Sequence, residues 1–267
     1  MRITTKQIEL LKKKLIDSEE IYNKAIDILH AQGAARLSQI ISRFFTAYGD
    51  GTYLTHAALM EPLTAKERKQ YPKRIKTRMD ALLYELTLFF REEGKAETKV
   101  IKDLQKEVIT ETWTTYREKE PTDRQVKTIQ SRSEAEERTN DNKIKQAAAI
   151  WLLLRQAMVR GETVKKTIIT VRDKYQKRAD TEAKRLAYTE DTFLSNETLK
   201  EVSKVQKYVF MTAGDGKVCD TCRPLHLHEF EYKERVVGVN YPPMHPWCRC
   251  LAIPIEEEIP IEEEDKT

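Results

Sequence analysis

The sequence contains no long uninterrupted run of apolar residues. Its longest run, residues 147–154, is far shorter than the roughly 20 apolar residues that a membrane-spanning helix requires. The first residues, MRITTKQIELLKKK, are charged and lack the apolar stretch of a secretory signal peptide. The sequence therefore predicts a soluble protein without membrane contact, made in a reducing cytoplasm.

Apolar and aromatic residues are also sparse. Hydrophobic residues make up 40% of the chain and aromatic residues 8%, whereas 34% of the residues are charged and the mean hydropathy is −0.64. This apolar content is too high for a disordered chain and somewhat low for one compact globule. Long amphipathic helices fit it better, because they expose many charges for each buried residue. We therefore expect a mainly α fold.

Apolar residues recur at helical spacing along most of the first 205 residues. The pattern predicts helices over residues 5–30, 73–93, 97–119, 122–160, 163–177 and 179–206, with another helix after Gly33 and short helical pieces within residues 52–72. Gly33, Gly94, Pro121 and Gly161 stand between these segments and are expected to separate the helices. His30 is then expected at the end of the first helix, where the helix dipole favours a cation.

The composition changes at about residue 206. All four cysteines and three of the five histidines lie between residues 219 and 250, and short β-like runs occur at residues 208–212, 230–233 and 251–255. We therefore predict three parts: a helical region over residues 1–205, a small zinc-stapled α+β module over residues 206–255, and an acidic disordered tail over residues 256–267.

The small module carries metal-binding residue types at metal-binding spacing. Cys219-x2-Cys222 is followed after 22 residues by His245-x2-Cys248-x-Cys250. The two thiolates of a CxxC pair reach one ion from a single turn, and a returning loop can bring a second pair to complete a tetrahedral site. A region of about 50 residues cannot build a large core, and a metal ion would supply the missing stability. We therefore predict a structural zinc ion.

Five candidate ligands compete for four positions. We expect Cys219, Cys222 and Cys250 to bind, and the fourth ligand is His245 or Cys248. A slight preference goes to His245, on the argument that side chains alternate along an extended chain and Cys248 would then be a packed thiol. The remaining pair, His226 and His228, is expected to lie on one face of a strand-like stretch as surface residues.

Three other interpretations of the cysteines remain open. Cys219 and Cys222 can form a redox pair, although no βαβ pattern surrounds them. The four cysteines can be unrelated buried thiols. A catalytic zinc would need an open position and a base such as Glu229 or Asp220, but neither an HExxH pattern nor a deaminase-type pattern is present.

The net charge of +4 conceals an asymmetry. Residues 252–267 contain seven acidic residues and one lysine, a charge of −6, which leaves +10 on the remainder of the chain. A basic body of this kind can indicate double-stranded DNA binding, but on charge alone the solvated surface of charged helices is the favoured interpretation.

Two stretches of the sequence resemble a known family. Residues 212–225, TAGDGKVCDTCRPL, and residues 242–250, PPMHPWCRC, are similar to the C-terminal signature of the phage minor head protein (Mu F-like head morphogenesis) family. In that signature an Asp precedes CxxC, and a variable loop leads to PP-x-HPxCRC. Upstream, residues 185–190, RLAYTE, resemble the family's R-x-x-x-TE helix. The segment after CxxC, Leu225-His-Leu-His-Glu229, departs from the family pattern, which often has Asp-Gly-Lys there.

The resemblance implies a minor capsid protein of a tailed phage or prophage. Such a protein is made in the bacterial host cytoplasm and is expected in the virion, inside the head near the portal protein, in few copies. The family is linked to viral capsid assembly, DNA packaging and DNA delivery. We expect the partners to be the portal and other head proteins, with the helices at 73–93 and 97–119 offering apolar stripes for contact.

Other function classes compete with this one. The chain can be a zinc-containing nucleic-acid-binding protein. An enzyme is the least favoured class: some relatives of the family carry toxin or ADP-ribosyltransferase domains, but the helices and the module use this whole chain, and it has no Gly-rich phosphate loop. The Glu118/Glu120 pair has the appearance of ordinary surface charge. We therefore expect a protein without enzymatic activity and without catalytic residues.

Overall fold

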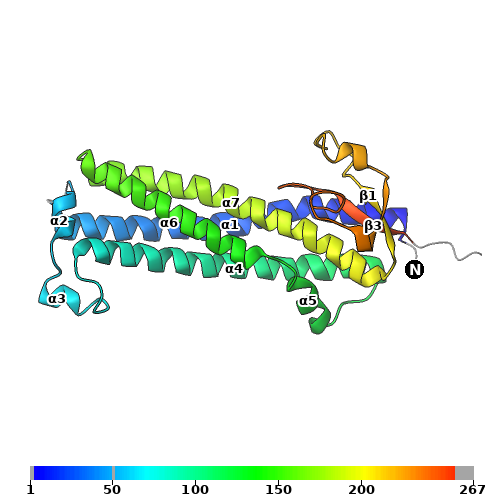
Figure 1. Cartoon of the computed structure of the whole chain (residues 1–267), viewed down its shortest axis with the longest axis horizontal. Coiled ribbons are helices and arrows are strands. Elements are labelled where there is room, and N and C mark those ends of the chain that lie inside the picture. The colour runs from blue at the N-terminus through cyan, green and yellow to red at the C-terminus, as the bar shows by residue number, and fades with distance from the viewer. Residues whose placement is uncertain (1–2, 50–51, 256–267) are drawn as a thin grey trace, which may run out of the picture. The chain divides into compact units, whose positions relative to one another are not determined.

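The computed structural model describes residues 3–49 and 52–255, and the predicted acidic tail lies outside them. Helices dominate the fold (Figure 1). They are α1 Thr5–Tyr48, α2 His56–Met60, α3 Ala65–Arg68, α4 Arg78–Arg117, α5 Asp123–Gln130, α6 Ala135–Val159 and α7 Val164–Ser203. Strands β1 Lys207–Met211, β2 Glu229–Glu231 and β3 Leu251–Ile255 follow, with 3-10 turns at Arg223–Leu225 and Tyr232–Glu234. The predicted mainly α fold with a small C-terminal sheet is confirmed.

Threonine side chains mark the starts of several helices. Before α5, the Thr122 hydroxyl accepts from the backbone N–H of Gln125, and the Gln125 side chain accepts from the backbone N–H of Thr122. Thr64 and Glu67 form the same reciprocal pair before α3, and Thr4 forms it with Gln7 before α1. Each pair satisfies N–H groups that a helix start leaves without partners, so the local sequence sets these boundaries.

Two of the predicted helix ends are wrong. Gly33 and Gly94 lie inside α1 and α4, which continue past them. A Cβ at Gly33 would clash with Tyr175 Oη and would lie 2.5 Å from a Glu93 carboxylate oxygen. Glycine is needed at residue 33 because the side chains of two other helices occupy the space where a Cβ would be.

In two places the structure joins or divides helices differently from the prediction. The helices predicted at 163–177 and 179–206 form the single helix α7, whereas the helix predicted at 122–160 is divided between α5 and α6. Pro121 and Gly161 separate helices as predicted, and Gly161 adopts a φ of 60° that suits glycine. The three strands match the three β-like runs to within two residues at each end.

The chain divides into two compact units that do not follow its order in sequence. One unit contains the described residues up to Glu20, Lys102–Ser133 and the described chain from Ala187 onward, and the other contains Ile21–Ile101 and Glu134–Leu186. Residues 206–255 therefore share a unit with parts of α1, α4 and α7 and with α5, rather than forming a unit of their own.

The unit of residues 21–101 and 134–186 is a helical bundle with an apolar core. Its buried side chains come from α1, α4, α6 and α7, and include Leu37, Ile41, Phe44, Phe45, Leu82, Leu86, Phe89, Phe90, Ile150, Leu154 and Tyr175. Each such side chain contributes roughly 1.5–3 kcal/mol by leaving water, so this core is the main source of the bundle's stability.

A charged network is buried in the same bundle. His30 Nδ1 lies 2.9 Å from Asp180 Oδ1, and its Nε2 lies 3.0 Å from Glu97 Oε2, which also lies 2.6 Å from Lys143 Nζ. His30 is 1% exposed and lies within α1, so its predicted place at a helix end is wrong. Burial alone would raise the pKa of Glu97, but the hydrogen bond from His30 and the charge of Lys143 outweigh it and lower that pKa.

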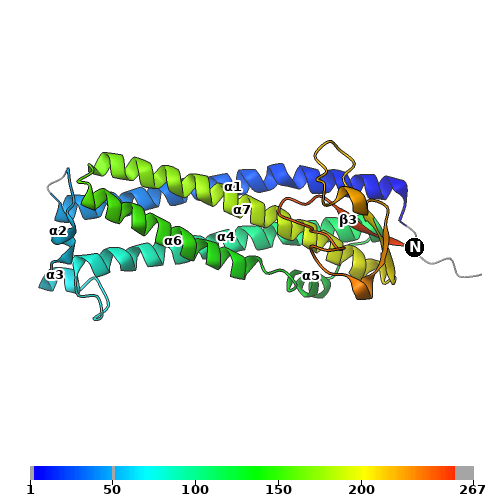
Figure 2. The same ribbon diagram turned by 45° about the horizontal axis from the view of Figure 1, so that its top comes forward.

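The other unit holds the sheet. Strand β1 lies in the middle and pairs antiparallel with β2 on one side and β3 on the other. Leu251 and Ile253 of β3 pack into a core with side chains of α1, α4, α5 and α7, including Leu11, Ile109, Trp113, Ile129, Leu194 and Leu199. Both views show β3 beside the C-terminal part of α7 (Figure 2). The helices thus hold the strand that follows Cys250.

Candidate metal centre

The first half of the centre is the turn that carries Cys219 and Cys222. The backbone N–H of Cys222 donates to Cys219 Sγ at 3.4 Å, and the backbone N–H of Arg223 donates to the Cys219 carbonyl at 3.0 Å. Burial raises the pKa of Cys219, but backbone N–H groups of Cys222 and Thr221 outweigh it and lower that pKa. The turn therefore favours the thiolate, which is the form that binds metal.

The second half is the segment from His245 to Cys250. The backbone N–H of Cys248 donates to the His245 carbonyl at 3.1 Å, and Trp247 adopts a φ of 65° between them. This tight turn points His245 and Cys248 back toward the CxxC turn. Strand β3 begins only at Leu251, so the Cys248–Cys250 pair lies before the regular strand.

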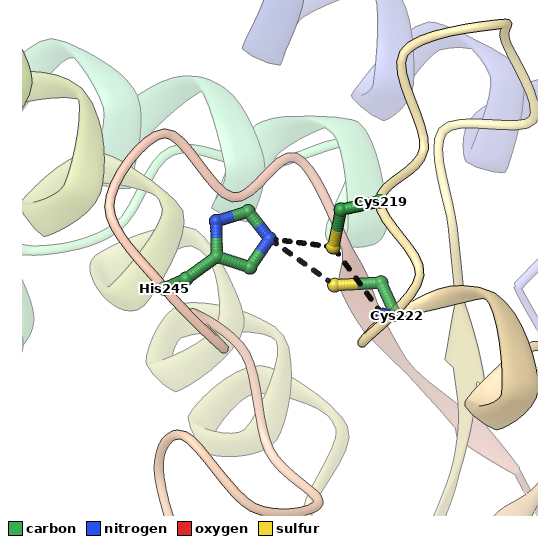
Figure 3. Close-up of side chains that lie close together, drawn as sticks. All are labelled: Cys219, Cys222 and His245. Atoms are coloured by element: carbon green, nitrogen blue, oxygen red, sulfur yellow. Dashed lines mark hydrogen bonds between the residues drawn. The ribbon is translucent and has the colours of Figure 1, made fainter.

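His245 faces both sulfurs of the CxxC turn (Figure 3). Its Nε2 lies 3.1 Å from Cys219 Sγ and 3.4 Å from Cys222 Sγ. Its Nδ1 lies 2.7 Å from the Pro246 carbonyl oxygen, which can only accept a hydrogen bond. Nδ1 therefore carries a proton, and in the neutral tautomer, the form that binds metal, Nε2 presents its lone pair to the two sulfurs. A backbone carbonyl that fixes the tautomer in this way is typical of metal-binding histidines.

The five predicted ligands come together in two overlapping groups. The ligand atoms of Cys219, Cys222 and His245 lie within 4.8 Å of one another, and so do those of Cys222, Cys248 and Cys250. Cys222 belongs to both groups, so the five residues form one continuous cluster. Cys222, Cys248 and Cys250 are buried. This donor set, one imidazole and four thiols, can hold a metal ion and matches the soft and borderline ligands of a tetrahedral zinc site.

The thiols cannot all ionise without a positive charge nearby. Hydrogen bonds from Cys222 and Cys250 lower the pKa of Cys248, whereas the hydrogen bond to Cys248 and burial raise the pKa of both Cys222 and Cys250. One thiolate is thus stabilised at the expense of its neighbours. A cation bound among them would remove this competition, because several buried negative charges need compensation.

The argument that disfavoured Cys248 is wrong. Along an extended chain, residues i and i+2 lie on the same face, so Cys248 and Cys250 can point together while Arg249 points away. The structure has this arrangement: Cys248 and Cys250 both face Cys222, and Arg249 instead binds Asp215 with distances of 2.5 and 2.7 Å. Geometry alone leaves Cys248 and Cys250 equivalent as candidates.

Helix α7 holds the backbone of this segment through three side chains. The Thr189 hydroxyl accepts from the Trp247 N–H at 3.3 Å, and the Thr192 hydroxyl donates to the Cys248 carbonyl at 2.6 Å. Asn196 donates to the Cys250 carbonyl at 3.2 Å and accepts from the Ala252 N–H at 2.6 Å. These residues are spaced by three and four, so they lie along one face of the helix.

These supporting residues were only partly visible in the sequence. Thr189 belongs to the R-x-x-x-TE segment and Asp215 to the segment before CxxC, but their partners could not be read from either motif. Thr192 and Asn196 were missed. Their spacing along α7 places them on one face of the helix. That pattern alone does not show which backbone they bind.

The remaining histidines of the module lie outside the cluster. His226 Nδ1 lies 3.1 Å from the Thr212 hydroxyl, and His228 contacts the ring of Phe230. Neither belongs to a group of metal-binding residue types among the described residues. All four cysteines are free thiols.

The sequence comparison agrees with the motif. Residues 148–253 match the family model described as Phage Mu protein F like protein. This stretch is similar to the Mu F-like family. The match covers less than half of the 267 residues, but it includes all five candidate ligands and the α7 residues that hold their backbone. It confirms the predicted resemblance and supports a phage head morphogenesis protein.

The comparisons with curated proteins and with solved structures found no match. Among the residues that the structure describes, no helix is both long and apolar enough to span a membrane.

Proposed function

We propose that this protein is a minor head protein of a tailed phage or prophage that acts at the portal during head assembly and DNA packaging or delivery. In this proposal its role is structural rather than enzymatic, and it resides in the virion, inside the head. The observation that carries the proposal is the Mu F-like match over residues 148–253, together with the family's cysteine and histidine motif in a single cluster.

The metal in this proposal is a structural zinc ion. Cys219, Cys222 and His245 would bind it together with Cys248 or Cys250, and the ion would join the CxxC turn to the segment that leads into β3. The segment between them, residues 223–244, places Tyr232, Tyr241 and Met244 in two small cores, and most of its other side chains are exposed. A bound zinc ion would fix this segment at both ends, which suits a small region with little core of its own.

The portal association is tested by co-expression with the cognate portal protein. The full chain carrying an affinity tag should retain the portal through a wash at moderate salt, and a major capsid protein of the same phage serves as the comparison. Absence of the portal from the eluate, with both proteins folded and soluble, contradicts the association. Mass spectrometry of purified virions should also find the chain in few copies relative to the portal.

Full-length variants are required for this test. A fragment of residues 1–205 would offer the helical region without the C-terminal module. However, Leu251 and Ile253 share one core with Leu11, Trp113 and Leu194, so cutting at residue 205 would open that core. Loss of binding by such a fragment would report unfolding as readily as a lost contact.

Double-stranded DNA is a second candidate partner that is compatible with the charge distribution. The chain without residues 252–267 carries +10, and this excess of lysine and arginine suits contact with phosphates. DNA contact would accompany the head function rather than replace it, because a head protein near the portal meets the packaged genome.

A further inference from the structure

The outer face of α6 is apolar but lies against nothing among the described residues. Ile144, Leu152 and Val159 are 68%, 53% and 74% exposed. They are spaced by eight and seven residues, close to two helical turns each, so they lie along one line of the helix. Ala148 is also exposed on this line. We call these four residues, with Lys145 and Arg155 beside them, the α6 outer face.

The α6 outer face is distinct from the side of α6 that packs in the bundle. The opposite side of α6 is well buried, through Thr139, Lys143, Gln146, Ile150, Leu154, Ala157 and Met158. The helix thus has a buried side, which packs in the bundle, and a separate exposed side that carries apolar residues. Contiguous exposed apolar residues on a charge-rich protein indicate an interaction surface.

A pocket of about 420 Å³ lies beside the face, between α4 and α6 of the same unit. It is lined by Thr87, Phe90, Arg91, Asn140, Lys143, Ile144 and Ala147. Ile144 belongs to both the pocket and the exposed line, so one surface combines an apolar ridge with an adjacent hollow. A helix of a partner protein fits such a surface, with an apolar side chain in the hollow.

The charged residues on the face itself are all basic, and the exposed Asp141 lies one turn before Ile144. Residues 142–161 contain no acidic residue, but include Lys143, Lys145, Arg155 and Arg160. Lys143 is buried with Glu97, and Arg160 lies 3.8 Å from Glu162. Arg91, Lys145 and Arg155 form no ion pair among the described residues. The rim of the surface therefore favours acidic groups on its partner.

These features distinguish between the candidate occupants. A second copy of α6 would bring the same cations face to face, which disfavours self-association through this surface. DNA would place phosphates against Leu152 and Val159, which cannot pair with them. An apolar protein helix flanked by acidic residues satisfies both the centre and the rim.

We infer that the α6 outer face is the surface with which this protein binds its head partner, through an acidic amphipathic helix of that partner. The inference rests on the proposed function, for which the portal protein is the partner. The α6 outer face takes the place of the apolar stripes of residues 73–93 and 97–119, which the sequence had suggested as the contact. Residues of those stripes are buried in the chain's own cores, among them Met79, Leu82, Leu86, Phe89 and Trp113.

The test measures the affinity of full-length variants for the purified cognate portal protein. The double variant Ile144→Ser/Leu152→Ser should weaken binding by at least about tenfold, since two central apolar contacts are lost. Arg155→Glu should also weaken binding, and the affinity should then depend less on salt. Matched controls are Ile28→Ser, at a side chain 55% exposed on α1, and Lys165→Glu, at an exposed site on α7.

The outcomes separate the two claims. If the unaltered chain does not bind the portal, the proposed function fails at its partner. If the unaltered chain binds and the α6 variants bind equally well, the assignment of the face is overturned while the portal association stands. If the control variants weaken binding as much as the α6 variants, the effect is not specific to this face and the assignment is also overturned. Unchanged thermal unfolding of each variant establishes that it is folded, since the altered side chains are exposed.

Discussion

His245 is the residue whose orientation argues most directly for a metal. Its Nδ1–H donates to the Pro246 carbonyl, and its Nε2 faces Cys219 and Cys222. A histidine placed only for packing would not need both arrangements. His245→Ala should therefore release most of the zinc from the full chain, because a four-ligand site then has three protein ligands. Zinc retained after gel filtration, measured by mass spectrometry, gives the result.

The same measurement has a control within the module. His228→Ala removes an imidazole outside the cluster and should leave the zinc content unchanged. Cys248→Ser and Cys250→Ser should differ from each other, since only one of these thiols completes the set with His245. Full retention of zinc by His245→Ala, with loss in both serine variants, would show that the two thiols bind together and that His245 is not a ligand.

At this scale the sequence predicted which residues meet, but not how they are held. Metal-binding residue types at close spacing limit the set of candidate ligands, since the spacing itself brings Cys219 and Cys222 to one turn. The hydrogen bonds from Thr192 and Asn196 to the Cys248 and Cys250 carbonyls join residues more than 50 positions apart. Such contacts follow from the packing of α7 against the segment, which local patterns do not contain.

At the scale of helices, Gly33 shows why boundaries were mispredicted. A glycine in a helical pattern reads as a break because it costs about 1 kcal/mol relative to alanine. Here its missing side chain leaves room for Tyr175 and Glu93. Gly33→Ala should therefore destabilise the protein by about 1–3 kcal/mol, the cost of overpacking, despite the better helix propensity of alanine. Thermal or denaturant unfolding measures it.

The control for Gly33 is Gly216→Ala. A Cβ at residue 216 meets nothing within 4 Å, so this change should have little effect. Stabilisation by Gly33→Ala would mean that residue 33 tolerates a side chain and that the close approach of Tyr175 is not a constraint.

The ionisation of Glu97 makes the stability of the bundle depend on pH. Its pKa is lowered in the folded protein, against an unfolded value of about 4.3. A carboxyl group of this kind contributes stability that is fully present above the unfolded pKa and is lost as the pH falls through the folded pKa. The free energy of unfolding should therefore decline below about pH 4. In the Glu97→Gln variant it should fall less steeply with pH over the same range.

The neutral variant also tests the network at pH 7. Glu97→Gln leaves Lys143 and His30 without their shared carboxylate, so it should cost roughly 3 kcal/mol. Glu92→Gln changes an exposed carboxylate that pairs with Arg36 and should cost far less. Equal costs for the two variants would contradict a network that depends on burial.

Helix existence was thus predictable, whereas helix continuity was not. The apolar stripes of α4 and α6 and the breaks at Pro121 and Gly161 follow from local rules. The joining of residues 163–177 to 179–206 in α7 depends on tertiary packing on both sides of the supposed break, including Tyr175, Ala179 and Ala183, which are almost fully buried.

At the scale of the whole molecule, the charge asymmetry predicts DNA binding that the C-terminal residues weaken. The full chain should bind duplex DNA without sequence preference, and its affinity should fall steeply with salt because bound phosphates release counterions. A chain ending at residue 255 should bind more tightly at low salt, because the acidic residues removed compete with phosphates. A chain with Gln in place of the glutamates at 256–258 and 262–264 keeps the length and should behave like the truncated chain. If neither the full nor the shortened chain binds DNA at low ionic strength, the basic residues serve only as solvated surface.

The central claim is that the Mu F-like region is built around a structural zinc ion, and the zinc content of the protein tests it most directly. Full-length protein, freshly prepared under reducing conditions, should contain about one zinc ion per chain. Its removal with a strong chelator should lower the unfolding temperature markedly and leave most of the helical signal at 25 °C, since structural zinc contributes on the order of 10 kcal/mol to small units and the bundle core is separate. The contradicting result is a reduced, folded chain that contains no zinc and whose unfolding is unchanged by added zinc or by the chelator.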